Sequence, residues 1–133
     1  LQLAAERGWL LLRGNHERYV LQYDRDRLRP EFADDPARRA IAAPVAWAHA
    51  QVAGRLDAIA ALPEQLRLDL GGETLAFYHA SLRHDRDGIT RASDDAELRE
   101  QVDPSTTLFC VGHTHVPLVR RLDRTLVVNA GSV

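Results

Sequence analysis

Short apolar runs that end at a histidine are the feature that most restricts how this chain can fold. Residues 75–78 read Leu-Ala-Phe-Tyr directly before His79, and residues 108–111 read Leu-Phe-Cys-Val before Gly112 and His113. Continuous apolar runs of this length are typical of strands that are buried on both faces of a sheet. Because loops at the carboxyl edge of such a sheet converge, these histidines are expected to meet at one edge.

A third apolar run, residues 9–12, precedes a polar segment that contains Asn15 and His16. It also predicts a strand buried on both faces. Three strands that each deliver an imidazole to one edge are typical of a metal site. Neutral imidazole is a good ligand for zinc, iron, manganese or nickel, and asparagine adds an oxygen ligand. Gly14 and Gly112, which precede the candidate ligands, would let the backbone turn sharply and approach them closely.

The spacing of His113 and His115 leaves two interpretations open. In an extended segment both side chains would face the same side, whereas in a turn they could reach two neighbouring metals. A lone histidine is more often a surface or core residue than a ligand, and this applies fully to His49 and His84. Asn15 and His16 taken alone would equally suit a turn and a helix cap. The prediction of a metal site therefore depends on the combination.

The rest of the chain predicts a layered α/β arrangement in which helices cover sheets. Its local signals are glycine and proline punctuation, helical spacing and acidic helix starts. They predict a helix that ends at residue 7 before Gly8 and a second helix in the first part of 18–29. A third helical region is predicted over 37–60. It would begin at Pro36, break near Pro44 and end before Pro63. They also predict a hairpin of 66–70 and 74–79 around Gly71 and Gly72, a helix from Ser93 to about 101 ended by Pro104, and strands at 107–111, 116–122 and 125–128.

The net charge, the length of the apolar runs and the cysteine count exclude some classes of function for this chain. The chain has 133 residues and a formal net charge of −2, which argues against a protein that wraps nucleic acid by bulk charge. No apolar run is long enough to span a bilayer. The single cysteine, Cys110, makes an internal disulfide impossible and favours a reducing compartment, so a cytoplasmic location is expected. The chain begins at Leu1, contains no methionine, and stops at Val133 directly after a predicted strand and a small-residue turn. Both of its ends are therefore expected to be cut.

Four blocks in order resemble the calcineurin-like metallophosphoesterases, and more closely their small bacterial phosphodiesterase-like branch. These blocks are Gly-Asn-His-Glu at 14–17, His79 after its apolar strand, Gly-His-Thr-His at 112–115, and Asn-Ala-Gly-Ser-Val at 129–133. The resemblance covers nearly the whole chain. It implies an α-β-β-α sandwich formed as one partial domain over residues 1–133, with residues 36–63 as a helical insertion that flanks the site.

The resemblance also implies a role for each matched residue. Asn15, His79 and His113 would bind the second of two divalent metals (manganese, iron, zinc or nickel), and His115 would bind the first. His16 would be no ligand but would donate a proton to the leaving oxygen of a small phosphorylated substrate. Outside these roles, Arg13 and Arg83 lie near the motifs and could contact the substrate phosphate, while Asn129 and Ser132 are expected to shape the loop beside the site.

The chain departs from the family pattern in ways that limit this expectation. The Asp-x-His and Gly-Asp blocks that hold the first metal and bridge both metals are absent, and Ala80 and Ala130 replace a usual glycine and proline. The fold is therefore expected to be incomplete at its N-terminus, and the isolated chain should bind metal weakly and show little or no activity. Apolar sheet edges left unpaired would make the fragment aggregate, form a homo-oligomer or need its own N-terminal part.

Two functions from different classes follow. The first is metal-dependent hydrolysis of phosphate esters, of diester or nucleotide type. The second is a non-catalytic scaffold of the same fold that binds protein. Retention of converging imidazoles favours an enzyme ancestor, because a scaffold has no need of them. A further possibility is that this chain is only a truncated record of a normal enzyme.

Overall fold

The computed structural model describes residues 2–26 and 36–132 and divides into two compact units. The sheet unit comprises Leu1–Gly14 and Pro63–Val133, and the helical unit comprises Asn15–Leu62. The predicted insertion 36–63 lies in the helical unit except for Pro63. The helical unit begins well before that insertion, at Asn15.

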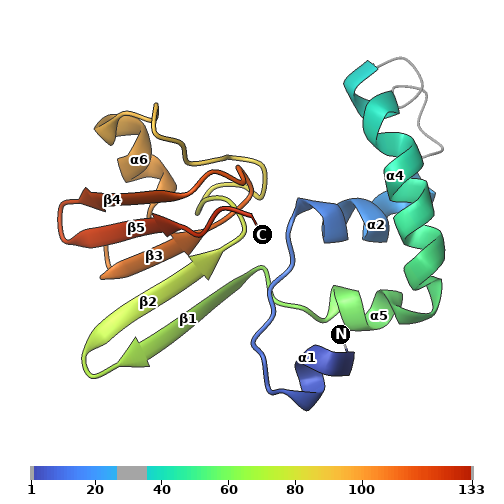
Figure 1. Ribbon diagram of the computed structural model, residues 1–133, viewed down its shortest axis with the longest axis horizontal. Helices are drawn as coiled ribbons and strands as arrows, with labels where there is room; N and C mark the ends of the chain where they lie inside the picture. Colours follow the sequence, from blue (N-terminus) through green and yellow to red (C-terminus); the bar gives the residue numbers. More distant parts are fainter. Residues whose placement is uncertain (1, 27–35, 133) are drawn as a thin grey trace. The chain divides into compact units, whose positions relative to one another are not determined.

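Five strands form one sheet in the order β1-β2-β3-β5-β4 (Figure 1). β2, β3 and β5 run parallel to one another, while β1 and β4 pair antiparallel at the two outer sides. The carboxyl ends of the three parallel strands therefore lie at one edge, which we call the carboxyl edge. The strands are β1 (Gln65–Leu70), β2 (Glu73–Tyr78), β3 (Leu108–Val111), β4 (Leu118–Leu122) and β5 (Thr125–Asn129).

The hairpin between β1 and β2 is confirmed, and its turn explains its register. Gly71 and Gly72 both have positive φ, 58° and 88°. A two-residue turn with positive φ at both positions matches the right-handed twist of paired strands, and glycine adopts it without steric cost. Leu70 is consequently paired with Glu73 across the turn.

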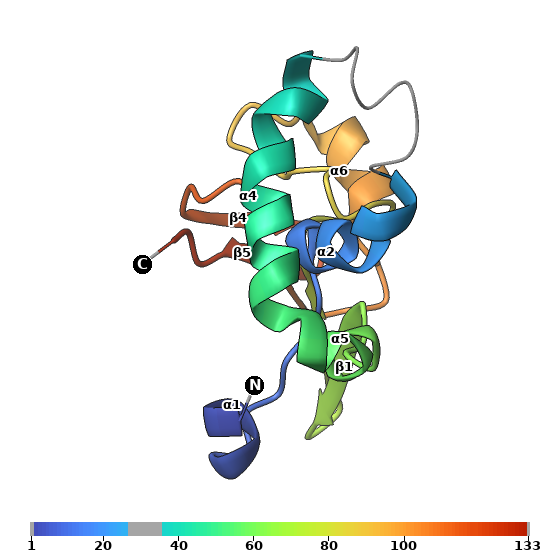
Figure 2. The same ribbon diagram turned by 90° about the vertical axis from the view of Figure 1, so that its right-hand side faces the viewer.

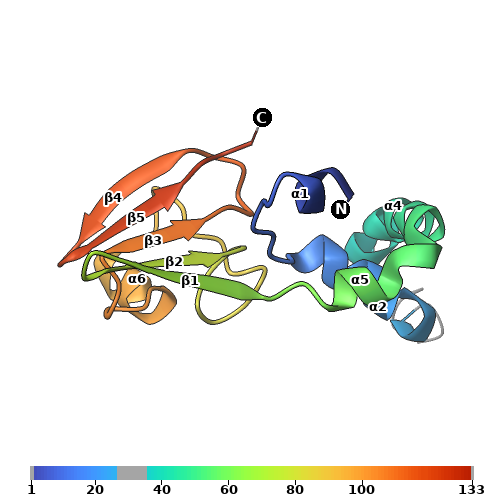
Figure 3. The ribbon, with the colours of Figure 1, turned by 90° about the horizontal axis from the view of Figure 1, so that it is seen from below.

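The hydrophobic core lies between the sheet and α6 (Asp95–Gln101), which covers one face of it (Figure 3). Ala76, Phe109 and Val127 are neighbours across β2, β3 and β5 and are fully buried. Leu98 of α6 is fully buried against them. The core therefore joins α6 firmly to the three strands whose ends form the carboxyl edge.

Local capping explains where α6 and the first helix begin and end. The Asp94 side chain accepts a hydrogen bond of 2.8 Å from the Glu97 backbone N–H, so the cap lies one residue after the predicted Ser93. The first helix, α1 (Gln2–Glu6), ends as predicted before Gly8, whose φ is 64°.

The helical unit contains α2 (Asn15–Asp26), α4 (Pro36–Val52), the 3-10 turn Ala53–Arg55 and α5 (Leu56–Ala60), as Figure 2 shows. α2 packs against α4 and α5. No helix in the described part of the chain has both the length and the apolarity needed to cross a lipid bilayer.

The predicted break near Pro44 is wrong, since α4 continues through it and the helical path is interrupted at Ala53–Arg55 instead. Proline removes one helical hydrogen bond, but packing can hold a helix together across that loss. Val45, directly after Pro44, is buried, and His49 Nδ1 lies 2.9 Å from the Val20 carbonyl oxygen of α2.

The predicted strand at residues 9–12 is also wrong. This segment has no regular secondary structure, and the side chains of Trp9 and Leu10 are 55% and 64% exposed. A segment becomes a strand only by pairing its backbone with a neighbour, and none of the five strands pairs with it. Apolar composition therefore predicted a buried strand for a segment that pairs with no strand among the described residues.

The α/β class is confirmed, with one sheet in the part of the chain that the structure describes. The face of the sheet that α6 does not cover is also apolar. It carries Leu66, Leu68, Leu75, Phe77 and Val128, which are only half-buried. Both faces of this sheet therefore have the apolar character expected of the inner layers of a sandwich.

Candidate metal centre at the carboxyl edge

His79 and His113 meet at the carboxyl edge. β2 ends at Tyr78 and its parallel neighbour β3 ends at Val111, so the loops that begin there lie side by side. The Nδ1 atom of His113 lies 3.2 Å from Nε2 of His79, with the two ring planes inclined at 69°. The convergence expected from the two strand ends is thus present in the sheet unit.

The separation of these nitrogens suits one divalent metal ion. Metal–nitrogen bonds of about 2.0–2.1 Å in a tetrahedral site place two imidazole nitrogens about 3.3 Å apart. The observed 3.2 Å is close to that separation. Among the described residues, no group of three or more His, Cys, Asp or Glu gathers to hold a metal ion. The two histidines therefore fit two positions in the ligand set of one metal ion. Asparagine is not among the His, Cys, Asp and Glu residues of such groups, so their absence among the described residues does not concern Asn15.

The segment after β3 is a turn. His113 and His115 have φ values of 64° and 60°, in the left-handed region that residues other than glycine seldom adopt. The Thr114 N–H donates to the Gly112 carbonyl oxygen across 2.7 Å, and the Gly112 N–H donates to the His79 carbonyl oxygen across 2.9 Å. Such conformations cost about 1–3 kcal/mol each and cluster at functional sites. Of the two interpretations of the His113–His115 spacing, the structure has the turn, with His115 exposed.

Asn129 holds this turn from β5, as expected of a residue that shapes the loop. Its side chain is buried, and Nδ2 donates to the Gly112 carbonyl oxygen at 2.6 Å and to Thr114 Oγ1 at 2.9 Å. Its Oδ1 accepts from the Gly131 N–H at 2.9 Å. Ser132 is exposed. All three parallel strands thus contribute to the carboxyl edge at which the histidines meet.

Two glycines allow the backbone to lie against the site. A Cβ atom at Gly14 would stand 2.5 Å from His79 Nδ1, and one at Gly88 would stand 2.6 Å from Thr114 Cγ2. Contacts this short require the neighbouring atoms to move. A Cβ at Gly112 would make only an ordinary contact, 3.5 Å from the His79 carbonyl oxygen. The close approach expected of Gly14 is therefore present, whereas Gly112 does not need it.

Asn15 and His16 belong to the helical unit, where they open α2. Asn15 is buried, whereas His16 is exposed and its ring lies edge-on to that of Tyr19 at 5.7 Å. His79, His113 and His115 belong to the sheet unit. The predicted site residues are thus drawn from both units, and within one unit the structure brings together His79 and His113.

Both candidate phosphate contacts already have carboxylate partners. The Arg13 guanidinium forms an ion pair with Glu64, and that of Arg83 forms ion pairs with Asp87 and Glu100. Contact of Arg13 or Arg83 with a substrate phosphate stays a prediction. In this structure both side chains hold segments of the sheet unit together.

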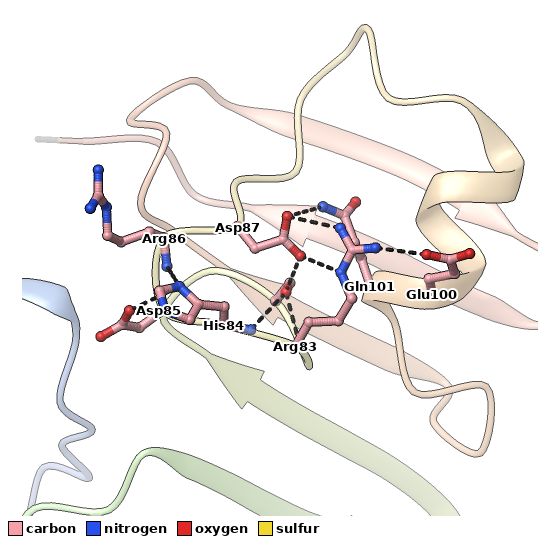
Figure 4. A network of polar contacts seen from close by, with 8 residues as sticks. Arg83, His84, Asp85, Arg86, Asp87, Glu100 and Gln101 are labelled. Carbon is pink, nitrogen blue, oxygen red and sulfur yellow. Dashed lines mark hydrogen bonds and ion pairs between the residues drawn. The ribbon is translucent and has the colours of Figure 1, made fainter.

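Asp87 is the residue that sequence reasoning missed (Figure 4). Hydrogen bonds from Arg83, Ser81 and Gln101 lower the pKa of its carboxyl group to about 2, against the opposing effect of burial. The signal available in the sequence was the four-residue spacing between Arg83 and Asp87 inside a polar segment. That spacing alone does not reveal the partner from α6.

Comparisons with known proteins agree with this geometry. The family model for the calcineurin-like phosphoesterase superfamily domain matches residues 8–133. A metallophosphoesterase from Sphaerobacter thermophilus is similar in structure, with a TM-score of 0.56, 26% identity, and coverage of 91% of this chain and 53% of that chain. A hypothetical protein from Pyrococcus horikoshii shares the fold, with a TM-score of 0.70, 16% identity, and coverage of 99% and 55%.

The chain thus spans about half the length of these two solved structures. A comparison with curated proteins found no match. The family model nevertheless covers most of the chain and includes each of the histidines at the carboxyl edge. This confirms the resemblance drawn from the four sequence blocks. The chain belongs to the calcineurin-like phosphoesterase superfamily.

Proposed function

We propose that this chain carries part of the active site of a hydrolase that cleaves phosphate esters with the help of divalent metal ions. The observation that carries the proposal is the 3.2 Å separation of His113 Nδ1 from His79 Nε2, in two loops that follow parallel strands. Family membership supports the same chemistry. Small phosphodiesters or nucleotide-type esters are the proposed substrates, and the single thiol, Cys110, suits the cytoplasm.

The proposed ligands are nitrogens of His79, His113 and His115 and the side-chain oxygen of Asn15. Two divalent metals, drawn from manganese, iron, zinc and nickel, would polarise the phosphoryl oxygens and lower the pKa of the attacking water when bound. Gly14, whose backbone lies against the His79 ring, directly precedes Asn15 and His16 in the sequence.

His16 is the proposed proton donor. In hydrolysis, the oxygen of a water molecule bonds to phosphorus, the bond from phosphorus to the leaving oxygen breaks, and a proton passes to that oxygen. An imidazolium ring suits this transfer because its N–H can donate a proton to the leaving oxygen. The ring of His16 is exposed and so can reach a substrate.

Metal binding by single-histidine variants tests the proposal. Calorimetric titration of the chain with Mn²⁺ should show weak binding that His79→Ala and His113→Ala reduce by about 10-fold or more. His84→Ala is the matched control, because His84 is an exposed histidine in the same unit whose ring accepts a hydrogen bond from the Arg86 N–H. Equal binding by all variants would contradict the assignment, and a complete lack of binding would favour the scaffold.

Hydrolysis assays test the chemistry. With Mn²⁺, bis-p-nitrophenyl phosphate and p-nitrophenyl phosphate distinguish diester from monoester cleavage. The chain by itself is expected to turn over slowly or not at all, and His16→Ala should lower any turnover that remains. Turnover equal to that of a relative of twice the length would show that this chain needs no further ligands.

A further inference from the structure

The segment that joins β2 to α6 carries a carboxylate in an unusually complete hydrogen-bonded setting. Each oxygen of Asp87 accepts two hydrogen bonds (Figure 4). Oδ2 accepts from Ser81 Oγ at 2.7 Å and from Arg83 Nε at 2.7 Å. Oδ1 accepts from Arg83 Nη2 at 2.9 Å and from Gln101 Nε2 at 2.9 Å. We call these four residues the Asp87 bracket.

The Asp87 bracket includes two buried residues of the sheet unit, Ser81 and Gln101. Ser81 is buried and stands two residues after His79, at the carboxyl end of β2. Gln101 is fully buried at the end of α6, and its backbone carbonyl oxygen accepts a hydrogen bond of 2.8 Å from the Leu82 N–H. Arg83 also reaches Glu100 of α6, at 2.8 Å. These contacts join the loop to α6 through the Leu82 backbone and through the side chains of Arg83 and Asp87.

The side-chain amide of Gln101 is oriented so that its N–H donates to Asp87 while its own oxygen has no hydrogen bond from any described residue. Within the described part of the chain, Gln101 Oε1 is a buried oxygen with no hydrogen-bond partner. Such a group costs about 1–3 kcal/mol. Rotating the amide would place this oxygen against the carboxylate of Asp87, which has no proton to donate when ionised. The bracket thus keeps a donor toward Asp87 although the amide oxygen stays unsatisfied.

Gly88 links the bracket to the histidine pair. It directly follows Asp87, and a Cβ at this position would lie 2.6 Å from Thr114 Cγ2 and 3.4 Å from His113 Cδ2. The backbone of Gly88 is therefore packed against the turn that carries His113. On the other side of the pair, Ser81 follows His79 by two residues and donates a hydrogen bond to Asp87.

We propose that Asp87 is a positioning residue for the histidine pair. By holding Ser81 and Gly88 at fixed places, it keeps His79 and His113 in the facing arrangement of their rings. The catalytic meaning of this arrangement rests on the proposed metal-dependent function. The positioning itself is a property of the metal-free chain and can be tested there.

A second carboxylate provides a matched control. The side chains of Asp103 and Asp87 are 19% and 22% exposed. Asp103 likewise combines an arginine partner, Arg67, with a serine partner, Ser105, and its pKa is lowered mainly by the Ser105 hydrogen bond. These contacts involve β1 and the turn after α6. Asp103→Asn therefore removes a similar interaction that does not involve Ser81 or Gly88.

The experiment compares Asp87→Asn with Asp103→Asn in the full metal-free chain. NMR of the histidine ring nitrogens reports tautomer and hydrogen bonding for each ring, and thermal unfolding reports stability. Both variants should lower the melting temperature, but only Asp87→Asn should shift the ring signals of His79 and His113. Unchanged ring signals in Asp87→Asn, or equal shifts in Asp103→Asn, would overturn the proposal.

Two milder variants keep the test decisive if Asp87→Asn does not fold. Ser81→Ala removes one of the four hydrogen bonds, and Gly88→Ala adds a methyl group against Thr114 and leaves the four bonds in place. Both should shift the His113 signals, and a lack of shift in both would contradict the proposal. If the chain binds Mn²⁺, Asp87→Asn should weaken binding by about 10–100-fold. If the chain binds no Mn²⁺, the proposed function fails, and the ring signals still decide the positioning role.

Discussion

Asn129 donates a hydrogen bond from Nδ2 to the carbonyl oxygen of Gly112 across 2.6 Å. This contact joins the ends of β5 and β3 at the place where the turn bearing His113 begins. The side chain that makes this contact is buried.

Asn129→Ala should therefore destabilise the sheet unit. The change leaves the Gly112 carbonyl oxygen without its side-chain donor, a loss that costs about 1–3 kcal/mol. Urea unfolding followed by circular dichroism measures the change. Asn129→Asp is the informative companion, because it keeps the oxygen that accepts from Gly131 and loses the Nδ2 donor. A loss of stability in the alanine variant alone would place the important contact at Gly131 instead.

Gly14→Ala should disturb His79. A methyl group there would stand 2.5 Å from Nδ1 of the ring, so the ring or the backbone must move, at a cost of about 1–3 kcal/mol. The matched control is Gly54→Ala, because a Cβ at Gly54 would meet nothing within 4 Å. The control should be neutral or stabilising, since alanine restricts the unfolded chain. Melting temperatures and the ring signals of His79 check the contrast, and similar behaviour of both variants would contradict it.

Acid should weaken the protein partly through Asp87. Its pKa is about 2 in the folded protein and 3.8 ordinarily, so the folded state holds the ionised form more strongly. The resulting stability is fully present above about pH 4 and is lost as the pH falls toward 2. It is on the order of 1–2 kcal/mol after solvent screening.

Free energies of unfolding measured between pH 7 and pH 2.5 test this dependence. Asp87→Asn should be less stable than the original chain at pH 7, and the difference should shrink at pH 2.5. A slope should remain in the variant, because the pKa of Asp103 is also lowered. A difference in stability that stays constant across this range would show that the charge of Asp87 is not the cause.

Cys110 should react slowly with alkylating reagents while the protein is folded. Burial raises the pKa of its thiol, which lowers the fraction of reactive thiolate. Iodoacetamide labelling at about pH 8, followed by mass spectrometry, should be slower for the native chain than for the chain in urea. Equal rates in the two states would mean that β3 opens readily.

Elements whose signals are local were predictable. Paired glycines with positive φ define the turn between β1 and β2, and the acidic start after Ser93 marks α6 to within two residues. The irregular structure of residues 9–12 and the continuous helix through Pro44 were not predictable. Whether an apolar segment becomes a strand depends on a distant pairing partner, and whether a helix survives a proline depends on the helix packed against it.

The same division holds at the candidate site. The sequence by itself determined which residues end the strands, and the parallel pairing of β2 with β3 in the folded chain then brought His79 and His113 together. Only the tertiary structure decided what holds them. Asp87 acquires its role from Gln101 on α6 and from the contact of Gly88 with Thr114, and no local spacing encodes either. Strand ends are read from short-range patterns, whereas a positioning network exists only after distant segments have packed.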